Sequence, residues 1–164
     1  MTERKLNVLF ICTGNSARSI LAEGMLNQLG ADRFHAYSAG SHPKGAVHSL
    51  ALATLKQLHF DNTGFSSKSW GDFGRDGALP MDFVITVCDQ AAGEACPVWP
   101  GQPITAHWGL PDPAAVVGSD EVQQRAFTDT AVTLKRRIEF LLSLPLDKLE
   151  KLSLQREVRD IGTR

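Results

Sequence analysis

One stretch near the N-terminus constrains the fold of this chain more than any other. An apolar run over residues 6–11 leads straight into Cys12 and a short polar loop, which ends at Arg18 and Ser19. Apolar residues then recur at helical spacing. A strand, a tight loop and a helix start in this order form a cradle whose backbone N–H groups converge on an anion. The stretch therefore predicts an oxyanion site in the first strand–helix connection.

The residues of this loop also predict a reaction. A cysteine beside a helix N-terminus and an arginine is expected to have a lowered pKa and to be largely thiolate at neutral pH. Gly14 is expected to supply the backbone freedom of the turn, and the Arg18 guanidinium can hold two oxygens of a tetrahedral oxyanion. We therefore expect Cys12 to attack phosphorus, arsenic or sulfur. The expected substrate-binding residues are Thr13, Gly14, Asn15, Ser16, Ala17, Arg18 and Ser19.

Predicted strands and helices alternate along the chain. Strands are expected at residues 6–11, 34–38, 82–87 and 104–107, and helices at 17–29, 48–58 and 120–144, with a short helix after Pro145. Residues 61–79 read as mostly loop, and residues 162–164 as a frayed end. This alternation indicates an α/β fold with a parallel sheet covered on both faces. Ligands of such sheets bind beyond the carboxyl ends of the strands.

Length and charge set broad limits on function. The 164 residues with 43% apolar content predict a single domain over residues 1–164, and the net charge of −1 does not favour nucleic acid or membrane partners. No apolar run is long enough to cross a bilayer. The cysteines number three, which argues against a structural disulfide framework. We expect a cytoplasmic monomer.

Cys12, Cys88 and the loop after His107, which holds Asp112, all follow predicted strands and are expected on one rim; Cys96 lies in the polar loop after Cys88. Cys88 and Cys96 enclose seven residues, wider than a CxxC pair, and no histidine lies at ligand spacing, so no metal site is expected. Two unrelated small hydrophobic residues are the alternative, which Cys88 fits better than Cys96. Asp112, in an Asp-Pro pair, could protonate a departing oxygen or could simply be a turn residue. Trp108 at a strand end is more typical of packing than of ligand contact.

These residues together resemble a known family. The segment from Cys12 to Ser19, followed by Ala22-Glu23-Gly24, is similar to that of arsenate reductases built on the low-molecular-weight tyrosine phosphatase fold. The family's later motifs match in order: Tyr37-Ser38-Ala39-Gly40, Val87-Cys88, Cys96-Pro97 and His107-Trp108-Gly109-Leu110-Pro111-Asp112-Pro113. The similarity spans residues 5–144 and implies a four-stranded parallel sheet flanked by helices. Residues 145–164 form a C-terminal extension, which we expect to be a helix packed on the domain.

The resemblance implies a thiol relay. Cys12 attacks arsenic while Arg18 and the loop amides hold the oxygens, and Asp112 protonates the departing hydroxide. Cys88 then attacks the Cys12 sulfur and arsenite leaves; Cys96 attacks Cys88 and frees Cys12. No cofactor is bound. The three-cysteine members use thioredoxin as external reductant, and coupling to glutathione and glutaredoxin is the alternative.

Two other functions compete with this one. A low-molecular-weight protein tyrosine phosphatase would use Cys12, Arg18 and Asp112 but leave the other cysteines idle. Such phosphatases have tyrosines after the Asp-Pro pair, whereas Ala114 and Ala115 offer a phosphotyrosine ring little to stack on. A non-catalytic redox-sensing module does not explain Arg18 or Asp112.

One departure from the family concerns a cation. Some relatives bind potassium beside the loop through an Asn, a Glu, a Ser and an Asp. Asn15, Glu23 and Ser38 match the first three, but Lys68 stands where the Asp would fall. Because a lysine ammonium could replace the cation, we expect no potassium requirement.

Overall fold

The structure, a computed structural model, describes residues 5–74, 78–88 and 102–164. Its sheet has four parallel strands in the order β2-β1-β3-β4, with β1 at Leu6–Cys12, β2 at Phe34–Gly40, β3 at Phe83–Thr86 and β4 at Ile104–His107. The predicted fold class is thereby confirmed. Strand β1 lies inside the sheet and is buried on both faces, which explains why its sequence is a nearly continuous apolar run.

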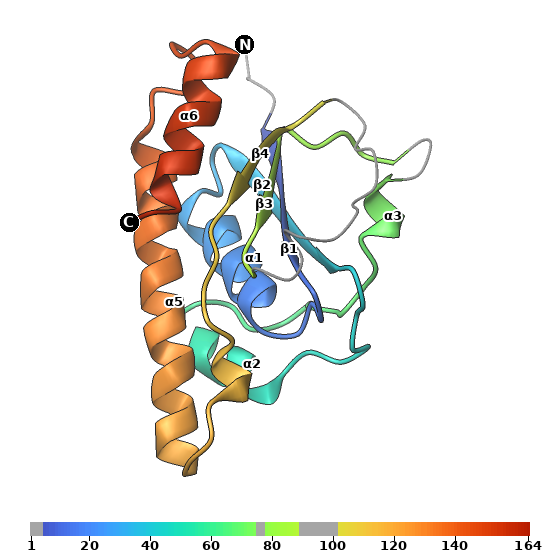
Figure 1. The fold of residues 1–164 in the computed structure, drawn as a ribbon, viewed down its shortest axis with the longest axis vertical. Coiled ribbons are helices and arrows are strands. Elements are labelled where there is room, and N and C mark those ends of the chain that lie inside the picture. The colour runs from blue at the N-terminus through green and yellow to red at the C-terminus, as the bar shows by residue number, and fades with distance from the viewer. Residues whose placement is uncertain (1–4, 75–77, 89–101) are drawn as a thin grey trace.

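The long helices gather on one side of the sheet (Figure 1). Helices α1 (Arg18–Leu29), α2 (Ser49–Gln57) and α5 (Asp120–Ser143) pack against one another. Helix α6 (Lys151–Ile161) lies beside α5 and on β4. The single-turn helix α3 (Gly71–Gly74) lies on the opposite side of the sheet, within the stretch expected to be mostly loop.

The register of the strands brings their carboxyl ends to one edge. Cys12 pairs with Gly40, and Thr86 pairs with both Ile11 and His107. The chain leaves β1, β3 and β4 at this edge, so the loop after Cys12, Cys88 and the segment before Asp112 lie near one another. This confirms the predicted common rim.

The C-terminal residues differ in detail from the prediction. Helix α6 begins at Lys151, later than the helix expected directly after Pro145. Its buried side chains are Leu154, Val158 and Ile161, whereas Leu152 is 79% exposed on the other side of the helix. The last residues do not fray. Gly162 packs against the His107–Trp108 peptide, and the main-chain oxygen of Arg164 accepts a hydrogen bond from Arg137.

Candidate active site

The loop between β1 and α1 is held from outside by its carbonyl groups. The carbonyl oxygens of Thr13, Gly14 and Ser16 accept hydrogen bonds from the backbone N–H groups of residues 42, 44 and 48, at 2.8–2.9 Å. The Ser67 hydroxyl also donates to the Gly14 carbonyl, at 3.0 Å. In a trans peptide the C=O and the following N–H point in opposite directions. The N–H groups that follow these carbonyls are therefore directed away from the outer partners, as a cradle for an oxyanion requires.

The residue that turns the loop is Asn15, and this corrects the expectation for Gly14. Asn15 has a φ of +46°, in the left-handed region that asparagine tolerates. Its amide supports that conformation by donating to Ser19 Oγ at 2.9 Å and accepting from the Lys68 N–H at 2.9 Å. A Cβ at Gly14 would lie 3.1–3.3 Å from the aliphatic stem of Lys44, so a larger residue there would require this exposed side chain to shift.

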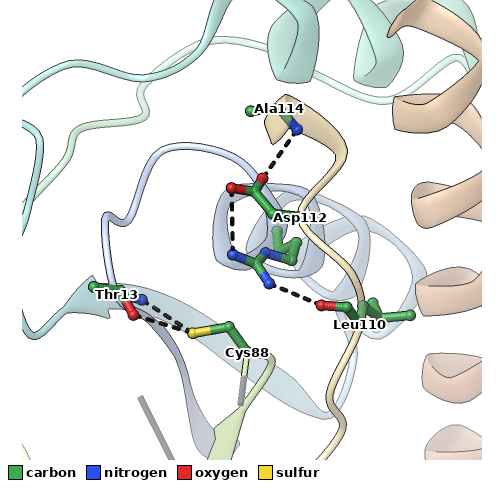
Figure 2. A network of polar contacts seen from close by, with 6 residues as sticks. Thr13, Cys88, Leu110, Asp112 and Ala114 are labelled. Carbon is green, nitrogen blue, oxygen red and sulfur yellow. Dashed lines mark hydrogen bonds and ion pairs between the residues drawn. The ribbon is translucent and has the colours of Figure 1, made fainter. Parts of the chain in front are cut away.

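The two described cysteines meet beneath the loop. The Thr13 N–H donates to Cys88 Sγ at 3.2 Å, and Thr13 Oγ1 lies 3.4 Å from the same sulfur (Figure 2). Cys12 and Cys88 are both buried. The hydrogen bond with Cys88 and then burial raise the pKa of the Cys12 thiol well above its ordinary value, against a lowering by Arg18. The expected lowering of this pKa is therefore not found, because the neighbouring thiol outweighs the guanidinium.

Arg18 and Asp112 face each other across the loop. Arg18 Nη1 donates to the Leu110 carbonyl at 2.8 Å, and Nη2 lies 3.8 Å from Asp112 Oδ2 (Figure 2). Asp112 Oδ1 accepts from the Ala114 N–H at 2.9 Å, which orients the carboxylate. Within the described part of the chain, Arg18 Nε is the buried side-chain donor without a hydrogen-bond partner. Such a donor is satisfied when an oxyanion occupies the loop.

The structure thus brings Cys12, Cys88, Arg18 and Asp112 to one site, whereas Cys96 lies outside the described residues. Two features were missed by the sequence analysis, namely the Leu110 carbonyl that anchors Arg18 and the Thr13 N–H bound to Cys88. Both involve backbone groups, which leave no signal in the residue type. No group of three or more His, Cys, Asp or Glu residues within 5–74, 78–88 and 102–164 is placed to hold a metal.

Behind the loop lies the set expected to bind or replace a cation. The Ser38 hydroxyl donates to Glu23 Oε1. Burial raises the pKa of Glu23. Burial lowers the pKa of Lys68, while the charges of Glu23 and Asp72 favour its protonated form. Lys68 thus places a cationic group near Glu23, as the potassium hypothesis requires, and the hypothesis itself stays a prediction.

Comparison with known proteins identifies the family of this chain. Residues 7–158 match the low molecular weight phosphotyrosine protein phosphatase family, and the chain belongs to this family. Its relatives there include an arsenate reductase from Halalkalibacterium halodurans, 33% identical over 132 residues, which are 80% of this chain and 91% of the relative. The resemblance stated from the sequence is confirmed.

Solved structures of arsenate reductases are also similar to this chain. An arsenate reductase in the phosphate-binding state matches with a TM-score of 0.68 and 31% identity, over 84% of this chain and 97% of that one. A thioredoxin-dependent arsenate reductase from Corynebacterium glutamicum matches with a TM-score of 0.60 and 26% identity, over 87% of this chain and 62% of that one. None of the helices in the described ranges is long and apolar enough to span a membrane.

Proposed function

We propose that this protein reduces arsenate to arsenite through a thiol–arsenate adduct and a cysteine relay. The observation that carries the proposal is the second thiol in the cradle: Cys88 is hydrogen-bonded to Cys12 and to the Thr13 N–H. Phosphate ester hydrolysis needs one thiol, an arginine and an acid. A buried second thiol in contact with the nucleophile is what disulfide formation needs.

The first step is displacement at arsenic. Arsenate enters the loop, and its oxygens take the place of the missing partner of Arg18 Nε. The thiolate is the nucleophile, so Cys12 must first lose its proton, which a bound arsenate oxygen takes up. The Cys12 thiolate forms an S–As bond while Asp112 transfers a proton to the departing oxygen, which leaves as water. Arsenic stays in the +5 state in this step.

The second step is the reduction. The Thr13 N–H and hydroxyl lie beside Cys88 Sγ and favour its thiolate, because hydrogen bonds to a charged form stabilise it. Attack of Cys88 on the Cys12 sulfur forms an S–S bond and breaks the S–As bond. The electron pair of that bond goes to arsenic, which leaves as arsenite in the +3 state. Two thiols are oxidised to one disulfide, so the electrons balance.

The third step regenerates the nucleophile. We assign it to Cys96, which would attack Cys88, release Cys12 and leave a Cys88–Cys96 disulfide. An external dithiol then reduces that disulfide. The similarity to a thioredoxin-dependent arsenate reductase supports thioredoxin as the reductant, with glutathione and glutaredoxin as the competing couple.

Single-turnover arsenite release tests this sequence. Cys12→Ser should release no arsenite while keeping the parent circular dichroism spectrum. Cys96→Ser should release one arsenite per enzyme and stop as a Cys12–Cys88 disulfide, which peptide mass spectrometry detects. Cys88→Ser should stop one stage earlier, as the adduct.

Three results would contradict the proposal. Near-normal turnover of Cys12→Ser would show that Cys12 is not the nucleophile. Full multiple turnover of Cys96→Ser with thioredoxin as sole reductant would reject the three-cysteine relay. A parent enzyme that hydrolyses aryl phosphates but releases no arsenite would establish the phosphatase instead.

A further inference from the structure

Helix α6 contacts the segment that leads to Asp112, although it contributes no residue to the oxyanion loop (Figure 1). Leu154, Val158 and Ile161 recur at helical spacing and are buried in the same core as the sheet. The helix lies on β4 and beside α5. The C-terminal end of α6 therefore meets the end of β4, where the chain leaves the sheet for the active site.

Trp108 forms the first link between α6 and the active-site segment. Its ring is fully buried, packs on Phe10 with centroids 6.1 Å apart, and donates from Nε1 to the Val158 carbonyl at 2.9 Å. Val158 belongs to the last turn of α6, where carbonyl groups have no regular partner within the helix. Donor and acceptor therefore satisfy each other, and separating them would leave both buried and unpaired.

Gly162 forms the second link. A Cβ at this position would lie 2.2 Å from the His107 carbonyl oxygen and 3.0 Å from Trp108 Cδ1. Its φ of −63° is open to any residue, so glycine is required here for space alone. Only a residue without a side chain lets the end of α6 approach the His107–Trp108 peptide this closely.

Arg137 of α5 forms the third link. It is 7% exposed, and its guanidinium donates to the Gly109 carbonyl at 3.3 Å and to the main-chain oxygen of Arg164 at 3.2 Å. One planar group thus joins the residue after Trp108 to the residues beyond α6.

The segment from Trp108 to Asp112 is short and restrained at its far end. The Leu110 N–H donates to the Val87 carbonyl at 3.2 Å, and the Leu110 carbonyl accepts from Arg18. Pro111 fixes its own φ, so few conformations of residues 108–112 satisfy the restraints at Trp108 and Leu110 together.

We propose that α6 is a positioning element for the catalytic acid, and that Trp108 and Gly162 are the positioning residues through which it acts. They hold residues 108–112 so that the Asp112 carboxylate faces the oxyanion loop. The inference rests on the proposed function, in which Asp112 protonates the departing oxygen.

A double-mutant cycle tests the proposal. Trp108→Phe keeps an aromatic ring but removes the N–H donor together with part of the buried indole, and Gly162→Ala pushes α6 away from β4. Each should lower kcat/KM for arsenate about five- to tenfold: Trp108→Phe because a buried hydrogen bond is lost, and Gly162→Ala because the added Cβ displaces the His107–Trp108 peptide. Inhibition by inorganic phosphate should stay within twofold, since the cradle is intact. In an Asp112→Asn background the same changes should cost less than twofold, because the acid is already absent.

Hydrogen exchange provides a readout independent of activity. Exchange of the Leu110 and Ala114 amides should accelerate in both variants. Leu152→Ala, on the exposed side of α6, is the matched control and should change neither exchange nor rate. If Trp108→Phe does not fold, the same measurements on Gly162→Ala test the inference.

Two results would overturn the inference: equal losses with and without Asp112, or unchanged exchange at Leu110 and Ala114. Failure of the proposed function looks different, because the parent enzyme itself would then release no arsenite while the exchange effects would remain.

Discussion

At the residue scale, the Cys12–Cys88 pair determines the chemistry of the site. A helix start and a neighbouring arginine lower the pKa of a cysteine. Here the neighbouring thiol and burial have the larger effect, and they raise the pKa of Cys12. In the proposed mechanism the same contact places the second sulfur for attack, so the group that lowers the reactivity of Cys12 before substrate binding is also the one that completes the reduction.

Removing Cys88 should therefore make Cys12 more acidic. In Cys88→Ala the hydrogen bond that raises the pKa most is lost, while Arg18 and the Thr13 N–H still favour the thiolate. The pH profile of iodoacetamide modification, followed by mass spectrometry of the Cys12 peptide, should move to lower pH. Cys96→Ala is the control and should leave the profile in place. An unchanged profile in Cys88→Ala would show that burial alone sets this pKa.

Asp112 should act as a general acid. Asp112→Asn keeps the acceptor for the Ala114 N–H but cannot donate a proton, so adduct formation should slow by roughly 10²–10⁴-fold. Rapid-quench measurement of the adduct in a Cys88→Ser background isolates this step. A loss below threefold would show that Asp112 is only a turn residue and an ion-pair partner of Arg18.

At the element scale, the loop depends on support from two segments that follow it in the chain. Segments before α2 and before α3 hold the loop carbonyls and the Asn15 amide, and Lys68 contributes both a backbone donor and a charge near Glu23. We expect that charge to take the place of a metal ion beside the loop.

We predict that potassium does not stimulate this enzyme, and that Lys68→Asp makes it potassium-dependent. In the variant an added carboxylate joins Asn15, Glu23 and Ser38, the oxygen-rich set that suits a monovalent cation. Arsenate reduction in potassium and sodium buffers of equal ionic strength measures the effect, with the exposed Lys148→Asp as control. Stimulation of the parent by potassium, or none in Lys68→Asp, would contradict the prediction.

At the scale of the whole molecule, α6 belongs to the same core as the sheet. A fully buried aliphatic side chain contributes about 1.5–3 kcal/mol to stability, and α6 buries Leu154, Val158 and Ile161. Cutting the chain before α6 would therefore expose core surface, which is why point substitutions test the helix better than truncation. This shared packing supports the prediction of one domain over residues 1–164, which stays a prediction.

Glu23 should make stability depend on pH. Its pKa in the folded protein is raised by burial above the usual 4.5, so between these two values the folded state binds more protons than the unfolded state. The contribution of Glu23 to stability is complete below pH 4.5 and is lost as pH rises through its folded-state pKa. Glu23→Gln should remove that part of the slope in urea unfolding measured from pH 4 to 8. Parallel curves for parent and variant would contradict the assignment.

The sequence by itself determined the order of strands and helices, the oxyanion loop and the family. These depend on local patterns: a continuous apolar run for a strand buried on both faces, helical spacing for α5, and the residues from Cys12 to Ser19. The exposed fraction of Trp108 also agrees with the packing role expected for it, since the ring is fully buried. The roles assigned to Cys12, Arg18, Asp112, Cys88 and Cys96 are still predictions.

Only the tertiary structure decided the pKa of Cys12, the residue that turns the loop, and what the C-terminal extension touches. The pKa depends on a thiol 76 positions away in the sequence. The left-handed conformation falls on Asn15, whose amide is held by Ser19 and by the distant Lys68 N–H. The contact of α6 with Trp108 joins a side chain to a backbone carbonyl 50 residues later. Burial and backbone hydrogen bonds between distant segments leave no local pattern, so the sequence could not predict them.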